Sequence, residues 1–210
     1  MSANLLETLI VFSRYPEAGK TKTRMIPALG AQGAAELQRQ MTEHTLKTAT
    51  KLQSIRNLSI EIHFAGGNLQ SISAWLGDRF SYIPQAEGDL GKKMDTAFQR
   101  AFGRGQQRVV IIGIDCPDLD YRILEQAFAS LQAVDLTMGV AADGGYYLIG
   151  LKRQIPDLFQ QIDWGTSLVL QQTSAIAQKL NLNTHYLTTL PDVDRPADLA
   201  IWHKHVNSEQ

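Results

Sequence analysis

Apolar residues along the chain fall into short β-branched runs that alternate with longer stretches of helical spacing. The clearest run covers residues 109–114 and ends in Asp115, Cys116 and Pro117. A continuous β-branched run bounded by turn residues is typical of a strand buried on both faces of a parallel sheet. We therefore expect a central strand that places Asp115 at its carboxyl end, where ligands bind in open α/β sheets.

The rest of the pattern alternates strands with helices. Strands are predicted over residues 5–12, 58–65, 80–84, 136–140, 146–151 (antiparallel to its neighbours) and 184–187. Helices are predicted over residues 31–52, 69–76, 90–102 with Asp89 as N-cap, 121–131, a segment up to residue 180 capped by Thr166 or Ser167, and a last one from Pro196. This alternation is typical of βαβ crossovers and predicts an α/β fold with a mostly parallel, mixed sheet. No repeat or linker divides the chain, so we expect a single domain over residues 1–210.

Composition narrows the classes of partner. The chain has 210 residues, of which 44% are hydrophobic and 20% charged, and its formal net charge is -1. Such a balance gives the whole molecule no electrostatic attraction to nucleic acid or to an anionic membrane. No basic leader and no apolar run of about 20 residues occurs, so we expect a cytoplasmic protein without a membrane span.

A basic loop follows the first predicted strand. Arg14, Gly19, Lys20, Lys22 and Arg24 combine backbone freedom with four cations, which suits phosphate binding. The spacing lacks the second glycine of a Walker loop. The alternative is a basic loop that is simply solvated.

Asp115 follows a buried strand, so its carboxylate must find partners or reach water. One candidate partner is Mg²⁺, which one or two carboxylates hold together with substrate phosphates and water. The alternative is a helix cap, which Asp118 or Asp120 could supply instead. Because Asp115 is expected at an open strand end, its replacement by Asn should cost little stability. Cys116 is expected to be a small packed residue, since no activating cation is identifiable.

The segment Asp143-Gly144-Gly145 sets a carboxylate before two residues that tolerate positive φ, which lets the backbone approach a ligand closely. The alternative is a plain hairpin turn.

Farther along, Asp192 and Asp194 are two residues apart and would share one face of an extended segment, where they could add a metal ligand. The alternative is that Asp194 caps the helix that starts near Pro196.

Taken together, these motifs resemble a known family, the bacterial glycosyltransferase-like proteins associated with radical-SAM gene neighbourhoods and proposed for arsenosugar biosynthesis. The resemblance covers about residues 5 to 200. The motifs are, in chain order, Phe12-Ser13-Arg14-Tyr15-Pro16 with Gly19 and Lys22-Thr23-Arg24, then Gln85 with Gly88-Asp89-Leu90-Gly91, Gly113-Ile114-Asp115-Cys116-Pro117, residues 143–151, Trp164, and Asp192-Val193-Asp194.

The resemblance implies the Rossmann-like three-layer α/β/α fold of A-type glycosyltransferases and small nucleotidyltransferases, with a mostly parallel mixed sheet. It also implies a nucleoside diphosphate-sugar or nucleoside triphosphate donor, and Mg²⁺ or Mn²⁺ at Asp115. The remaining implied site residues are Arg14, Lys22 and Arg24 near the donor phosphates, and Gln85, Gly88 and Asp89 beside the base and ribose.

The leading interpretation is metal-dependent glycosyl transfer to a small-molecule acceptor. Asp115 and Asp194 would bind the metal, and Lys22 and Arg24 would neutralise the charge of the phosphates. Asp143 would orient or deprotonate the acceptor hydroxyl. Transfer of a nucleotidyl group to a phosphorylated metabolite is the close alternative. A third is a non-catalytic nucleotide-binding protein. The sequence leaves the oligomeric state open, with a homodimer as one assembly.

Overall fold

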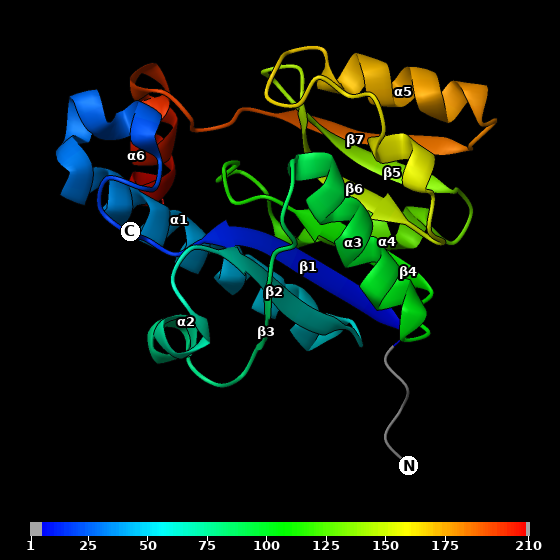
Figure 1. Ribbon diagram of the computed structural model, residues 1–210, viewed down its shortest axis with the longest axis horizontal. Coiled ribbons are helices and arrows are strands. Elements are labelled where there is room, and N and C mark those ends of the chain that lie inside the picture. Colours follow the sequence, from blue (N-terminus) through cyan, green and yellow to red (C-terminus); the bar gives the residue numbers. More distant parts are fainter. Residues whose placement is uncertain (1–5, 209–210) are drawn as a thin grey trace.

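The computed structural model describes residues 6–208, and its strands form one seven-stranded sheet in the order β3-β2-β1-β4-β6-β5-β7 (Figure 1). The strands are β1 (Glu7–Arg14), β2 (Ser59–Ala65), β3 (Ser81–Pro84), β4 (Arg108–Ile112), β5 (Leu136–Ala141), β6 (Tyr146–Leu151) and β7 (Thr184–Leu190). Every strand pair is parallel except the two that β6 forms with β4 and β5. The predicted mixed sheet and its antiparallel strand are therefore confirmed.

Helices cover both faces of the sheet. They are α1 (Ile26–Ile55), α2 (Leu69–Leu76), α3 (Leu90–Gly103), α4 (Tyr121–Ser130), α5 (Val169–Lys179) and α6 (Leu199–Ser208), with short 3-10 turns η1 (Thr23–Met25), η2 (Pro156–Phe159) and η3 (Pro196–Asp198). Buried residues of α1, α4 and α6 form one hydrophobic cluster, and buried residues of α3, α5 and η2 form the other. These two clusters make the three layers of the predicted α/β/α fold.

The strand sequences explain the layers. Side chains alternate between the faces of a strand, so Leu9 and Val11 of β1 pack into the first cluster while Ile10 packs into the second. Val110 and Ile111 of β4 divide in the same way. Because both faces are covered, these strands are apolar at almost every position, which is the pattern the sequence shows.

Several element ends differ from prediction, and the starts of α1 and α5 differ most clearly. Helix α1 begins at Ile26 and contains Gly30 with φ 68° and ψ 170°, a kink that periodicity alone placed outside the helix. The cap predicted for α5 is wrong: neither Thr166 nor Ser167 is its N-cap, because the helix begins at Val169 after Leu168 without a side-chain cap. Residue 5, which opened the first predicted strand, lies outside the described residues. Within residues 6–208, no helix is long and apolar enough to cross a bilayer.

Candidate functional site

A pocket of about 440 Å³ opens at the carboxyl ends of the parallel strands. Its lining includes Arg14 at the end of β1, Gln85 just after β3, Asp115 after β4, Asp143 after β5 and Asp192 after β7. Side chains far apart in the sequence meet here because parallel strands end at the same edge of a sheet, which is where open α/β sheets bind ligands. The volume suits a drug-sized ligand.

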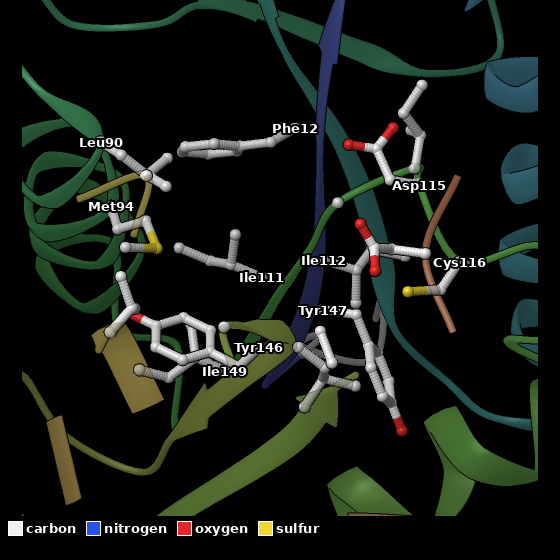
Figure 2. Close-up of a pocket in the computed structure, with 18 of the residues that line it drawn as sticks. Phe12, Leu90, Met94, Ile111, Ile112, Asp115, Cys116, Tyr146, Tyr147 and Ile149 are labelled. Atoms are coloured by element: carbon white, nitrogen blue, oxygen red, sulfur yellow. The ribbon is translucent and has the colours of Figure 1, made fainter. Parts of the chain in front are cut away.

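One side of this pocket is apolar. Phe12, Leu90, Met94, Ile111 and Tyr146 lie on that side in Figure 2, while Asp115 lies on the other. Trp164 also lines the pocket, and its ring packs so closely on the start of α3 that a Cβ at position 91 would lie 2.7 Å from it. Leu90 lines the pocket and is 44% exposed.

Phe12, on the apolar side of the pocket, is supported by a chain of buried polar contacts. Its ring stacks on His63 with centroids 5.7 Å apart, and His63 Nε2 lies 3.2 Å from a carboxylate oxygen of Glu61. Glu61 also accepts from Arg104. Burial pushes the pKa of Glu61 upward, but the hydrogen bond to His63 and the charge of Arg104 outweigh it and hold that pKa below its usual range.

A lowered pKa predicts an acid-sensitive contribution to stability. Above the ordinary glutamate pKa the Glu61 contribution is fully present, and it is lost as the pH falls through the lower folded-state value. Glu61→Gln should therefore cost about 1 to 2 kcal/mol at pH 7. That cost should shrink as both proteins are taken below pH 4 in denaturant titrations. A constant difference across the acid range would contradict this role for the charge.

Asp115 is bound to Lys22 across the chain. The Lys22 ammonium donates to Asp115 Oδ1 at 2.8 Å and to the carbonyl of Val193 at 2.8 Å. The Lys22 side chain is 5% exposed and the Asp115 side chain 49%. Lys22 itself has φ 41°, an uncommon conformation for a non-glycine residue. Its ammonium is therefore held between the Asp115 carboxylate and the Val193 carbonyl, while the Asp115 side chain stays half exposed.

The segment after β5 is a hairpin turn, as one of the two alternatives predicted. Asp143 Oδ1 accepts a hydrogen bond from Gly145 N at 2.8 Å, which orients the carboxylate at the pocket. Gly144 has φ 92°, and a Cβ there would lie 2.3 Å from the carbonyl oxygen of Ser167. Glycine is thus required both for the turn and for the close approach of the segment before α5.

Asp192 and Asp194 face different surroundings. Asp192 lines the pocket with Asp115 and Asp143. Burial raises the pKa of Asp192, and so do the negative charges of Asp143, Asp198 and Asp115. Asp194 instead forms an ion pair with Arg24. Asp194 does not cap η3 either, because Arg195 holds that position and Asp198 accepts its backbone N–H.

The predicted residues thus divide into two groups. Arg14, Arg24, Gln85, Asp115, Asp143 and Gly145 line the pocket, whereas Gly19, Lys22, Gly88, Asp89, Gly144 and Asp194 do not. Asp89 accepts from Lys92 N at 2.8 Å as the N-cap of α3. Gln85 Nε2 donates to the carbonyl of His63 at 2.9 Å and so ties the ends of β2 and β3. The site roles given to these residues stay predictions.

The carboxylates suit a hard divalent cation without forming a complete cage. Among residues 6–208, no three His, Cys, Asp or Glu side chains are placed to hold a metal ion together. Oxygen ligands from one or two carboxylates, completed by phosphates and water, are the usual arrangement for Mg²⁺. Asp115 and Asp192 fit that arrangement, because both line the pocket and their charges repel without a cation.

Cys116 is packed, as predicted. Cys116 is buried and lines the pocket. Burial raises its pKa well above the usual range, and the neighbouring charges of Asp115, Asp192 and Asp143 raise it further. It therefore stays a protonated thiol rather than a nucleophile.

Comparison with solved structures assigns the fold. A "putative nucleotide-diphospho-sugar transferase" from Desulfovibrio desulfuricans G20 matches with a TM-score of 0.89 and 33% identity, over 95% of this chain and 87% of that one. A CMP:2-keto-3-deoxy-manno-octonic acid synthetase complexed with CTP matches at TM-score 0.63 and 11% identity, covering 97% and 99%. Rv0371c of Mycobacterium tuberculosis H37Rv, complexed with manganese, matches at 0.59 and 15%, covering 97% and 99%.

The sheet and its edge pocket therefore define the Rossmann-like fold that nucleotide-diphospho-sugar transferases and nucleotidyltransferases share. Residues 45–166 match the model of a family described as "Uncharacterized protein conserved in bacteria (DUF2064)", and the chain belongs to that family. No curated protein matches the chain.

Several pocket residues were not among those predicted. Leu90 and Met94 have helical spacing and were assigned to the helix. A helical repeat of 3.6 residues does not indicate that the first turn of α3 faces a pocket and not the core. Tyr146 begins the antiparallel strand, so its start rather than its end reaches this edge. Asp192 was weighed with Asp194 from their spacing, but only the structure shows which of the two joins Asp115.

Proposed function

We propose that this protein is a metal-dependent glycosyltransferase that uses a nucleoside diphosphate-sugar and a small-molecule acceptor. The observation that supports this is the division of one pocket into an apolar half, next to Phe12 and Leu90, and a carboxylate half around Asp115. A nucleoside diphosphate is divided in the same way, because its nucleobase is largely apolar and its diphosphate is charged. The 33% identical relative, described as a transferase of this kind, points in the same direction.

The chain's own residues divide the work. The nucleobase of the donor lies against the apolar half of the pocket near Gln85. Arg14 and Arg24 attract the donor phosphates, since a guanidinium group binds two phosphate oxygens at once. Lys22 acts through Asp115, whose carboxylate it holds in place. Asp143 faces the acceptor and takes the proton from its hydroxyl.

Asp115 and Asp192 would hold Mg²⁺ or Mn²⁺. When bound, such a cation neutralises charge that develops on the leaving diphosphate. Asp194 joins only if its ion pair with Arg24 opens. We therefore place Asp192 ahead of Asp194 as the second carboxylate.

Product analysis tests the proposal. The protein is first screened for thermal stabilisation by nucleotides with and without Mg²⁺ or Mn²⁺, because a ligand that binds only the native state raises the apparent stability. It is then incubated with labelled sugar nucleotides and nucleoside triphosphates. Release of nucleoside diphosphate supports glycosyl transfer, and release of pyrophosphate supports the nucleotidyltransferase alternative. Binding that is insensitive to metal chelation and yields no product would support a non-catalytic protein.

Lys22→Ala should weaken nucleoside diphosphate binding about tenfold and leave nucleoside binding nearly unchanged, because the loss of a charged hydrogen bond frees Asp115. Calorimetric titration with both ligands measures this. Lys20→Ala is the matched control, since Lys20 is exposed and pairs with Glu17 outside the pocket. Equal weakening of both ligands would count against a phosphate-linked role for Lys22.

Two finer expectations belong to the same proposal. One is a role in arsenosugar biosynthesis, which the family resemblance implies. A homodimer predicts a molecular mass of about twice 23.3 kDa by light scattering. Neither expectation is needed for the assignment of the pocket.

A further inference from the structure

Two glutamine side chains reach the pocket from different elements. Gln38 lies on α1 and is only 5% exposed, and the half-buried Gln85 follows β3 directly. Both residues line the pocket. Their amide nitrogens meet at Ser13, because Gln38 Nε2 lies 3.4 Å from Ser13 Oγ and Gln85 Nε2 lies 3.4 Å from the Ser13 carbonyl oxygen. The two amides are therefore neighbours at the carboxyl end of β1.

Backbone carbonyls fix the orientation of both amides. Gln38 Nε2 donates to the carbonyl of Arg14 at 3.1 Å, and Gln85 Nε2 donates to the carbonyl of His63 at 2.9 Å. A carbonyl oxygen can only accept a hydrogen bond, so the nitrogen of each amide must face it, and the reversed amide is excluded. Each side chain therefore turns its Oε1 atom away from these carbonyls.

The two amide oxygens are available to a ligand. Among residues 6–208, no group donates a hydrogen bond to either oxygen. Neither oxygen is sealed from solvent, so each is open toward the pocket that its side chain lines. A polar atom of a largely buried side chain costs free energy unless water or a ligand meets it. The pair therefore points to a ligand with two neighbouring hydrogen-bond donors.

We propose that Gln38 and Gln85 select guanine as the base of the donor nucleotide. This inference rests on the proposed function, in its use of a nucleotide donor. The Watson–Crick edge of guanine carries an N–H group and an amino group side by side, which two fixed acceptor oxygens match. In uracil, cytosine and adenine the neighbour of the donor is itself an acceptor, so one amide oxygen would meet a repelling lone pair.

Other groups that line the pocket are compatible with guanine. Arg14 and Lys93 are hydrogen-bond donors, and they can meet the guanine O6 oxygen or the phosphates. Phe12, one residue before Ser13, brings the apolar side of the pocket to the same strand end (Figure 2). Guanine therefore has a partner for each polar atom of its edge and an apolar surface beside it.

Base analogues test the proposal on the unchanged protein. GDP, ADP, UDP, CDP and IDP are titrated calorimetrically in the presence of Mg²⁺. We expect GDP to bind at least roughly tenfold tighter than ADP, UDP or CDP. IDP differs from GDP only in lacking the amino group, and it should bind about tenfold more weakly because one amide oxygen loses its donor.

Variants connect this preference to the two glutamines. Gln38→Met and Gln85→Met each remove one acceptor and keep the length of the side chain. Each should lower the preference for GDP over UDP severalfold, and one of them should bring GDP and IDP to equal affinity. Gln40→Met is the matched control, since Gln40 is exposed on the same helix and donates to Glu36. Gln85→Met and the IDP comparison decide the question even if Gln38→Met does not fold.

The outcomes separate the base preference from the proposed function. A preference for GDP that depends on the amino group and on the glutamines supports the inference. Equal affinity for GDP and UDP or for GDP and IDP overturns it and leaves the nucleotide donor in place, and so does a GDP preference that the variants retain. Equal binding of GDP and IDP with weaker binding of 2′-deoxy-GDP would assign the oxygens to the ribose instead. If no nucleotide binds, whatever its base, the proposed function fails and the inference fails with it.

Discussion

Asp115→Asn should abolish the metal-dependent part of nucleotide binding, with a loss of affinity of about a hundredfold in the presence of Mg²⁺ or Mn²⁺. The amide keeps the size of the carboxylate but removes the charge that serves the cation, while the apolar half of the pocket remains. Nucleotide titrations with metal and with chelator measure the effect. Metal-dependent affinity equal to that of the unchanged protein would remove Asp115 from the site.

The structure also revises the expected stability of this variant. An open strand end suggested little loss, but the Lys22 side chain is only 5% exposed, and after the change its ammonium meets a neutral amide oxygen in place of a carboxylate. Because Asp115 is itself half exposed, the penalty is that of a partly screened pair, about 1 to 2 kcal/mol. Asp115→Asn combined with Lys22→Met should recover part of it in denaturant unfolding. No recovery would place the loss elsewhere.

Gly144→Ala should be the most damaging single substitution considered, at about 3 kcal/mol or more. The added Cβ would lie 2.3 Å from the Ser167 carbonyl oxygen, and the backbone has φ 92°. The clash is with backbone atoms and the strain lies in the backbone itself, so no rotation of a side chain can relieve either one. Nucleotide binding should weaken as well, because the turn that carries Asp143 must move.

Gly103→Ala is the matched control for that substitution. Gly103 ends α3, has no Cβ contact within 4 Å and has no left-handed φ. Alanine there should be neutral or should stabilise by up to about 1 kcal/mol. Chemical denaturation of both variants gives the comparison. A Gly144→Ala protein as stable as Gly103→Ala would show that the turn before β6 is free to relax.

The strands and helices of this protein could be predicted well from the sequence because they depend on local rules. The β-branched run before Asp115 became the buried strand β4, and Asp89 became the cap of α3. Strand β6 was predicted to be antiparallel from the double glycine before Tyr146. Each of these features follows from side-chain period, cap chemistry or turn chemistry within about ten residues.

The site was predicted less completely because it depends on pairings across the chain. Spacing proposed Lys22 for phosphate, but only the fold shows its ammonium under Asp115. Asp194 pairs with Arg24, which lies 170 residues before it, whereas Asp192 lines the pocket. No local sequence pattern carries such information. The amphipathic pattern of a helix also cannot show whether Leu90 packs in the core or lines a pocket.

The bond between Lys22 and the Val193 carbonyl spans 171 residues, so almost the whole chain must be in place before it closes. Contacts of such separation form late, since the entropy of closing the intervening loop must first be overcome. The binding pocket would then be among the last features to form on the folding pathway. Recovery of nucleotide binding during refolding should lag behind the recovery of helical circular dichroism, and a nascent chain that stops before residue 193 should fail to bind nucleotide even when its first strands have paired.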